Sequence, residues 1–343
     1  MNRRQFNKIA AGIAAGAVLG PFKVQGSVIK GSQIMTVTGA IDSSEAGICL
    51  SHEHILVDFT GDGERGIQRL KKRKVIKGIL PYMEKIKSLG VRTFFDCTPA
   101  YVGRNPKFLK KIAKKSGINI VSNTGYYGAH DNKFLPVFAS VETADQLATR
   151  WIREWHRGMQ GTRIKPGFIK IGVNMGKLSE MHRKLARAAA ITHGETGLTI
   201  AAHTGSGEGA FEELEVLAEE GIDASAFIWV HAQAEKDTAL HVSAAGKGAW
   251  ISFDNVNSKR IDIYVSLLMN MKQNNLLSKV LISHDGGWYH PGEYSGGIIS
   301  RYTDIFTDLV PALVQAGFSL AEIDQLLIQN PADAYTIRKR LKR

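Results

Sequence analysis

Cysteine is almost absent from this chain, which has only Cys49 and Cys97 among its 343 residues. Both lie inside apolar, strand-like runs, so we expect two buried, small hydrophobic side chains rather than a disulfide that holds the fold together. The chain also has no low-complexity segment, no internal repeat and no linker-like stretch. With 44% hydrophobic and 22% charged residues, its composition is that of a soluble globular protein and argues against a disordered or membrane-embedded chain.

An uncharged apolar run, Ile9–Leu19, lies near the amino terminus and is too short to span a membrane durably. The paired arginines Arg3-Arg4 precede it and small residues follow it, an order that resembles a twin-arginine export signal. We therefore predict a signal peptide over residues 1–26 and a periplasmic or otherwise exported protein. A first helix of the mature fold is the alternative, but such a helix would carry polar residues on one face, and this run carries none.

The formal net charge is +12, and the predicted signal peptide contributes only basic residues to it. Other lysines are concentrated in runs such as Lys71–Lys74 and Lys110–Lys115. A basic surface can bind nucleic acid or anionic substrates. Because both runs fall in segments with helical periodicity, we interpret them as solvated outer faces of helices. We expect no nucleic-acid partner and no stable membrane association, and the sequence leaves a homodimer open.

After a β-rich lead-in, a short apolar strand, a polar turn and a helix-period segment recur along the chain. The predicted strands are Ile48–His54, Thr93–Cys97, Asn119–Asn123, Gly167–Ile171, Leu198–His203, Phe227–His231, Ala249–Phe253 and Lys279–His284. The predicted helices are Val75–Leu89, Pro106–Ser116, Val141–Met159, Glu180–Glu195, Glu208–Glu220, Asp237–Ala245, Ile261–Asn275 and Tyr302–Ala316.

This alternation favours a parallel α/β sheet closed into a (β/α)8 TIM barrel, forming a single domain over residues 27–343. A doubly wound open sheet is the alternative. Its signature would be a Gly-rich phosphate turn after its first strand, and it usually has fewer strands than the eight predicted here.

The sequence Ser51-His-Glu-His54 places two histidines one residue apart on a predicted strand. Side chains alternate along a strand, so His52 and His54 face the same side and can bind one metal ion, while Glu53 faces the other side. His203 and His231 each end an apolar strand, and Asp285 follows the eighth. The carboxyl ends of barrel strands are where active sites form, so these residues predict one metal site.

Lys170 lies inside the apolar strand Gly167-Phe-Ile-Lys-Ile-Gly. Burial of an ammonium without a partner is costly and favours the neutral amine. A neutral amine can add carbon dioxide to become a carbamate, an anion able to bridge two cations. A lysine paired with a buried acid is the alternative, but four histidines at matching strand ends favour the bridging role.

These residues together resemble the phosphotriesterase family of the amidohydrolase superfamily, which includes phosphotriesterase-like lactonases and related hydrolases. The family has His-x-His on strand one, a carboxylated lysine on strand four, single histidines on strands five and six, and an aspartate on strand eight. The matching residues here are His52, His54, Lys170, His203, His231 and Asp285. The segments Asp96–Asn105, Thr124–Tyr127, Glu195–Thr204 and Asn330–Ala332 also agree, so that the resemblance spans about residues 36 to 333.

The resemblance implies two divalent metal ions, most often zinc, with Lys170 N6-carboxylated between them. It implies attack on the substrate by a hydroxide that bridges the ions, and proton transfer by Asp285. His231 is a second catalytic candidate and a possible relay together with His284. For His284, an orientation toward the outer helices is the alternative.

The resemblance implies a small ester as substrate, first a lactone or a carboxylic ester and then a phosphotriester. The candidate substrate contacts all follow predicted strand ends: Tyr101, Tyr127, Arg260, Trp288 and His290. Two alternatives stay open. One is other amidohydrolase chemistry, such as amide hydrolysis or deamination, although deaminases typically lack the bridging lysine. The other is a non-catalytic periplasmic binding barrel, which would be expected to have lost some of these ligands.

Overall fold

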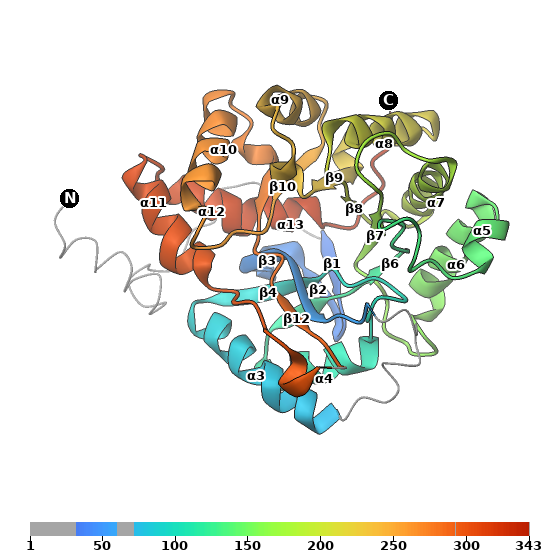
Figure 1. The fold of residues 1–343 in the computed structure, drawn as a ribbon, viewed down its shortest axis with the longest axis horizontal. Coiled ribbons are helices and arrows are strands. Elements are labelled where there is room, and N and C mark those ends of the chain that lie inside the picture. Colours follow the sequence, from blue (N-terminus) through green and yellow to red (C-terminus); the bar gives the residue numbers. More distant parts are fainter. Residues whose placement is uncertain (1–31, 60–71, 292, 343) are drawn as a thin grey trace.

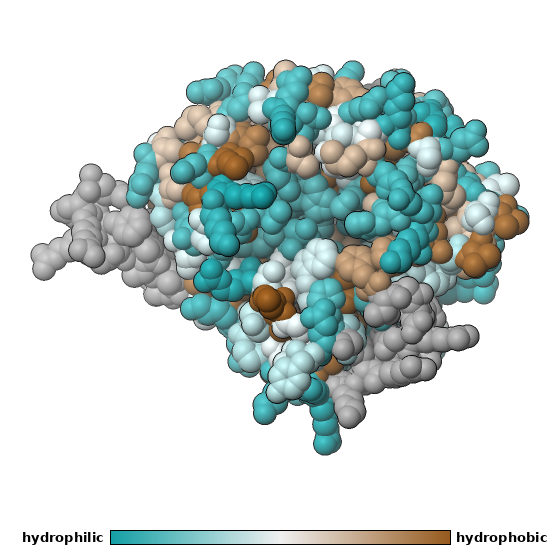
Figure 2. Space-filling view, in the orientation of Figure 1, coloured by the Kyte–Doolittle hydropathy of each residue, from teal (hydrophilic) through white to brown (hydrophobic). Residues whose placement is uncertain are grey.

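The computed structural model describes residues 32–59, 72–291 and 293–342. The predicted signal peptide, residues 1–26 with Arg3-Arg4, lies outside these described residues. Within them, no helix combines the length and the apolar character that a membrane span requires. The face of the molecule drawn in Figure 2 is mostly hydrophilic and is interrupted by small groups of apolar side chains.

Parallel strands occupy the centre of the molecule and helices surround them (Figure 1). In chain order the strands are β3 (Ile48–Leu56), β4 (Val91–Asp96), β5 (Asn119–Val121), β6 (Asn123–Thr124), β7 (Phe168–Gly172), β8 (Ile200–His203), β9 (Phe227–Val230), β10 (Trp250–Phe253) and β11 (Val280–Ile282). Strands β5 and β6 share the third position of the barrel, because β5 pairs with β4 and β6 pairs with β7. Every other neighbouring pair from β3 to β11 is also parallel.

The ring closes between β11 and β3. The Ser51 hydroxyl donates to the carbonyl oxygen of Ile282 at 3.1 Å, and the amide of His52 donates to the Ser283 hydroxyl at 2.9 Å. The predicted (β/α)8 barrel is thus confirmed, with all eight strand positions in the predicted order.

The outer helices are α3 (Lys72–Ser88), α4 (Pro106–Ser116), α5 (Phe138–Val141), α6 (Ala144–Arg157), α7 (Glu180–Thr196), α8 (Gly207–Glu219), α9 (Thr238–Gly246), α10 (Ile261–Gln273), the π-helix η6 (Ile305–Leu309) and α11 (Val310–Gln315). Short 3-10 turns are η1 (Ser43–Glu45), η2 (Ala224–Ala226), η3 (Ala232–Ala234), η4 (Leu277–Lys279) and η5 (Tyr294–Gly296). The outer helices bury apolar stripes at helical spacing, such as Phe108, Leu109 and Ile112 on α4.

The predicted helix Val141–Met159 is wrong at its start. Residues Phe138–Val141 form the separate helix α5, and α6 begins only after Thr143. Thr143 and Gln146 form a reciprocal capping box, which fixes the first turn of α6 at this point. The Thr-x-x-Gln spacing was the available sequence signal.

Both ends of the described chain cover the barrel at the amino-terminal ends of its strands. The hairpin β1 (Gln33–Thr36) and β2 (Gly39–Asp42) places Ile34 against the barrel interior. Three short helices, α12 (Leu320–Asp324), the π-helix η7 (Gln325–Gln329) and α13 (Asn330–Ala334), were not predicted. Asn330 donates to the carbonyl oxygens of Leu277 and Val280, and Tyr335 stacks on Phe95 with ring centroids 3.9 Å apart.

A buried acid joins α8 to the end of β8. Glu213 is fully buried and accepts a hydrogen bond from the Thr204 hydroxyl at 2.6 Å, while its other oxygen, Oε1, has no partner among the described residues. Burial raises the pKa of Glu213 to about 8, although the Thr204 bond and Lys170 oppose the shift. The folded protein therefore keeps this carboxyl protonated at pH values where the unfolded chain ionises it.

We predict that this group destabilises the fold as the pH rises. Below about pH 4.5 the Glu213 carboxyl is protonated in both the folded and the unfolded state. Above that pH the unfolded chain loses the proton, whereas the folded protein keeps it until about pH 8. Across that window the free energy of unfolding should fall, by at most about 1.4 kcal/mol per pH unit, relative to Glu213→Gln, whose amide does not titrate. Urea unfolding of both proteins at several pH values measures this difference. A constant difference from pH 5 to pH 8 would contradict the prediction.

Candidate metal centre

Six predicted ligands line one narrow cavity of about 50 Å³ at the carboxyl ends of the strands. β3 contributes two of them, β7 and β8 one each, and the segments after β9 and β11 one each. These residues are His52, His54, Lys170, His203, His231 and Asp285. The parallel strands bring them together because each side chain stands at the same end of its strand.

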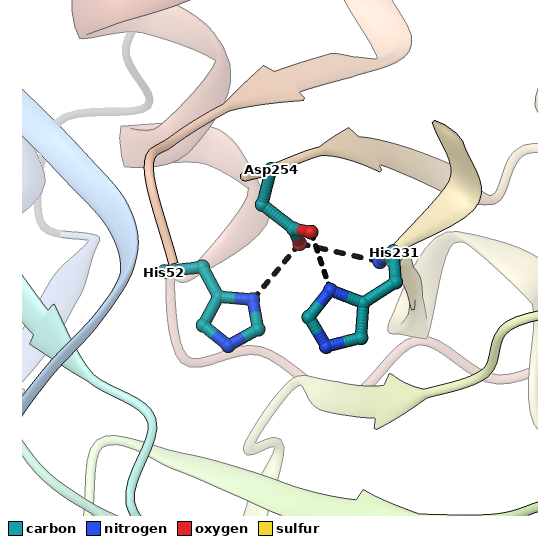
Figure 3. A group of neighbouring side chains, drawn as sticks. All are labelled: His52, His231 and Asp254. Carbon is teal, nitrogen blue, oxygen red and sulfur yellow. Dashed lines mark hydrogen bonds and ion pairs between the residues drawn. The ribbon is translucent and has the colours of Figure 1, made fainter. Parts of the chain in front are cut away.

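Asp254 orients two of the histidines (Figure 3). It is fully buried at the end of β10, and its two carboxylate oxygens lie 2.9 Å from Nδ1 of His52 and 2.5 Å from Nδ1 of His231. A carboxylate only accepts hydrogen bonds, so both imidazoles donate from Nδ1 and keep Nε2 for the cavity. Burial opposes ionisation of Asp254, but His231 and His52 outweigh it and hold its pKa well below the usual range.

His54 and Asp285 approach each other on the opposite wall. Nδ1 of His54 bonds to the Thr98 hydroxyl at 2.8 Å, and its Nε2 lies 3.0 Å from Oδ1 of Asp285. The same oxygen is 3.6 Å from Nε2 of His52. Burial lowers the pKa of His54 to about 3, with Lys170 adding to the shift, so the ring is neutral.

His203 lies between Tyr127 and His231. Its Nε2 is 3.4 Å from the Tyr127 hydroxyl, and its ring centroid is 4.4 Å from that of His231. Nδ1 is therefore the nitrogen of His203 that no hydrogen bond within the described part of the chain uses. Burial, reinforced by His231 and Lys170, lowers the pKa of His203 well below its ordinary value.

Lys170 is buried among these groups with no carboxylate partner. Only 2% of its surface is exposed, and its Nζ makes a single 3.3 Å hydrogen bond to the carbonyl oxygen of Ile171. Within the described ranges it forms no ion pair. Burial lowers the pKa of Lys170, which favours the neutral, nucleophilic amine. The alternative of a lysine paired with a buried acid has no support in these contacts.

The residues fit a site for divalent cations. Oδ1 of Asp285 is buried and has no hydrogen-bond donor among the described residues, although two imidazole nitrogens lie within 3.6 Å of it. Neutral imidazoles that donate from Nδ1 present a lone pair at Nε2, so acceptor atoms face one another across the cavity. Such an arrangement is costly unless a cation lies between the acceptors. His52, His54 and Asp285 have ligand atoms within 4.8 Å of one another.

Glu53, which points away from the cavity, holds the backbone that carries Asp285. Its Oε1 accepts from the Ser283 hydroxyl, from the amide of His284 and from Nδ1 of His284, and its Oε2 accepts from the amide of Gly286 at 2.7 Å. Asp285 has a φ of 50°, a left-handed conformation that non-glycine residues rarely adopt. Bonds on both sides of it stabilise this strained residue.

We predict that Glu53→Gln loses metal as well as stability. The amide cannot accept from all four donors, so Asp285 should relax from its strained position. Metal affinity should fall about 10- to 100-fold, and the free energy of unfolding of metal-free protein by about 3 kcal/mol. Atomic absorption after dialysis and urea unfolding measure the two effects.

Glu154→Gln is the matched control, because Glu154 receives two bonds from Arg104 and one from Thr124 away from the cavity. It should lower stability and leave metal content unchanged. Equal metal content in Glu53→Gln and Glu154→Gln would limit Glu53 to a purely structural role.

The predicted substrate contacts divide into two groups. Tyr127 and Trp288 line the cavity. Tyr101, Arg260 and His290 do not. Tyr101 packs against Tyr126 and Phe138, and Arg260 is exposed at the start of α10. None of these three residues lines the cavity, so their contact with a substrate stays a prediction.

The contacts of His284 do not fit the proton-relay role considered for it. Its Nδ1 donates to Glu53, and its Nε2 accepts from the amide of Ile305 at 3.1 Å. Both ring nitrogens are used to fix the segment after β11 against η6. The alternative orientation, toward the outer helices, is the one observed.

Sequence reasoning missed Asp254, Thr98 and the part of the apolar cavity wall other than Tyr127 and Trp288. Asp254 directly follows β10, so the rule that found Asp285 would have found it too. The segment after β11 also contains a short strand, β12 (Gly287–Tyr289), which pairs with β3 and carries Trp288 to the cavity. That pairing has no clear sequence signal.

A parallel eight-stranded barrel with this cluster at the carboxyl ends of its strands has the architecture of metal-dependent hydrolases. The family model of the Phosphotriesterase family matches residues 32–335. The chain therefore belongs to the phosphotriesterase family, whose members are binuclear metal hydrolases.

Relatives of known sequence match most of the chain. A phosphotriesterase homology protein of Escherichia coli is 29% identical over 84% of this chain and 98% of its own length. An aryldialkylphosphatase of Saccharolobus solfataricus is 27% identical, with coverage of 85% and 96%. Among solved structures, an organophosphorus hydrolase from Deinococcus radiodurans superposes with a TM-score of 0.80 at 25% identity, covering 91% of this chain and 99% of that one.

Proposed function

We propose that the protein hydrolyses small ester-type bonds with two divalent metal ions, zinc by preference. A lactone or a carboxylic ester is the first candidate substrate, and a phosphotriester is the second. The observation that carries the proposal is the convergence of six potential ligands on one cavity, in which the buried Oδ1 of Asp285 faces Nε2 of His52 and has no donor among the described residues. Relatives and structural neighbours include an aryldialkylphosphatase and a PTE-like lactonase, whose names agree with this class of bond.

The proposed roles follow from the contacts of each residue. His52, His54, His203, His231 and Asp285 would be the ligands, with N6-carboxylated Lys170 between the two ions. When bound, the ions would supply a Lewis acid for the substrate oxygen and lower the pKa of a bound water. Asp285 is the carboxylate in the cavity wall, so it would accept the proton of the attacking water. His231 would be kept in one tautomer by Asp254.

The cavity wall favours a neutral substrate. Besides the six candidate ligands it consists of Val57, Phe59, Cys97, Pro99, Val102, Tyr127 and Trp288. Lys170 is the only lysine or arginine among the described lining residues, and we assign it to the metals. An anionic group that lies against this wall, away from the ions, would therefore be desolvated without a partner. Lactones, esters and neutral phosphotriesters meet this constraint.

Amide hydrolysis is the second candidate reaction, since relatives named N-acetyltaurine hydrolase are 23% to 24% identical to this chain. The apolar wall argues against that particular substrate, because its sulfonate would find no basic partner among the lining residues. A non-catalytic binding barrel has less support still, since all six candidate ligands are present.

A substrate screen tests the proposal. Zinc-loaded protein should hydrolyse lactones or aryl esters faster than dialkyl aryl phosphates, and should leave N-acetyltaurine unchanged. Asp285→Asn serves as the background control and should lose at least about 100-fold in kcat/KM, the usual scale for a general base. Turnover of N-acetyltaurine alone would replace the ester proposal with amide chemistry. Equal rates for wild type and Asp285→Asn would contradict the assignment of the site.

We predict that Lys170→Ala loses metal and activity together. Removal of the bridging anion leaves two cations with fewer ligands, so metal affinity should fall more than 100-fold, beyond the usual effect of an indirect contact. A short-chain carboxylic acid should then restore part of both, because its carboxylate can occupy the vacated place. Metal analysis with and without the acid measures this. Full metal content and activity in Lys170→Ala would overturn the bridging role.

We also propose that the protein is exported. The support is the paired Arg3-Arg4 followed by a short uncharged run, both outside the described residues. Replacing both arginines with lysine should retain the protein in the cytoplasm. Cell fractionation with mass spectrometry of the amino terminus measures this. Uncleaved wild-type protein in the cytosolic fraction would contradict export.

A further inference from the structure

The positive charge of the chain is concentrated on two helices. Helix α3 carries six lysine or arginine residues and α4 carries five, while Glu84 on α3 is the only acid on either helix. For comparison, the formal net charge of the entire chain is +12. A field of one sign over neighbouring elements attracts an oppositely charged surface.

These cations point outward because the other face of each helix is buried. On α4 the buried positions are Pro106, Phe108, Leu109, Ile112, Ala113 and Ser116. The exposed cations of the two helices are Arg73, Lys74, Lys77, Lys85, Lys87, Lys107, Lys111, Lys114 and Lys115. We call this set the α3–α4 face. Within the part of the chain that the structure describes, none of them forms an ion pair, whereas several arginines on α6 and α7 pair with glutamates.

The two helices form one continuous surface. They are neighbours along the outside of the barrel, and Nζ of Lys87 donates to the carbonyl oxygen of Ser116 at the end of α4 at 2.7 Å (Figure 1). The charge therefore lies on a single wall of the barrel rather than on two separate sides.

Exposed apolar side chains stand at the edge of this wall. Tyr294 and Ile298 are both 92% exposed, in the segment that follows β12. Lys74 of α3 lies 5.5 Å from the centroid of the Tyr294 ring. Lysines beside an exposed tyrosine and an exposed aliphatic side chain are the combination that binds the interface of a bilayer.

We propose that the α3–α4 face, with Tyr294 and Ile298 at its edge, docks on an anionic phospholipid surface. The docking is electrostatic and reversible, and it does not depend on the proposed hydrolase activity. Each lysine near such a surface contributes about 1 kcal/mol. Because salt screens exposed charges, docking weakens as the ionic strength rises. This differs from stable membrane insertion, for which no described helix is suited.

Nucleic acid is the competing anionic partner, and the face fits it less well. Eight of the nine exposed cations are lysines, whereas the planar guanidinium of arginine is the cation best suited to nucleic-acid recognition. Single-stranded nucleic acid is bound through several aromatic side chains on which bases stack, and Tyr294 is the only fully exposed aromatic at the edge of this face among the described residues.

Vesicle sedimentation with the full chain tests the proposal. Wild type should bind vesicles of phosphatidylcholine and phosphatidylglycerol and should not bind pure phosphatidylcholine vesicles. The triple variant Lys107→Gln, Lys111→Gln, Lys114→Gln should bind about 100-fold more weakly, at roughly fivefold per charge. The contribution of the Tyr294 side chain is apolar and is not screened by salt. Tyr294→Ser should therefore weaken the part of the binding that remains when the salt concentration is raised.

The matched control removes three exposed lysines from other sides of the barrel, Lys236→Gln, Lys247→Gln and Lys259→Gln. It has the same net charge as the α4 variant and should bind like wild type. Circular dichroism confirms that both triple variants are folded. Equal loss in both variants, no binding by wild type, or tighter binding of duplex DNA than of the mixed vesicles would each overturn the proposal.

Discussion

The site depends on the contact between the Glu53 carboxylate and the segment that follows β11. Four donors from residues 283–286 converge on this one buried group. Because side chains alternate along β3, the residue between His52 and His54 faces away from them and toward the last strand. Residues 52–54 of β3 therefore both close the barrel, through Glu53, and supply two candidate ligands, His52 and His54. Asp285, between two anchored residues, is held in a left-handed backbone conformation that it would not adopt alone.

A second set of buried groups determines what the cavity can bind. Asp254 accepts the Nδ1 protons of His52 and His231, so the Nε2 lone pairs of these two rings remain for the interior, and Thr98 holds the ring of His54 through its Nδ1. Burial lowers the pKa of Lys170 and so favours its neutral amine over the ammonium form. The result is an acceptor-rich cavity with an apolar wall, which suits it to cations.

The barrel and the six-residue cluster were predictable from sequence because the repeating strands of the barrel also position the ligands. A polar residue that ends an apolar parallel strand points into the mouth of the barrel, and this rule placed His203, His231 and Asp285. It did not place Tyr101 or His290, because a loop can turn its side chains in any direction after a strand ends. Tyr101, for example, has a φ of 68° and packs against Tyr126 instead. The π-helical turns and the pairing of β12 with β3 arise from tertiary packing and leave no periodic signal.

The central claim is that two cations separate the acceptor groups of this cavity, and anomalous X-ray diffraction from zinc-loaded crystals tests it most directly. The account predicts two peaks about 3.5–4 Å apart, one beside His52, His54 and Asp285 and the other beside His203 and His231. Continuous density should join Nζ of Lys170 to both. A single peak at full loading would contradict the claim. So would an ion bound by Asp254 and the Nδ1 atoms of His52 and His231, the other arrangement of ligand atoms in this cluster that is close enough to hold a metal.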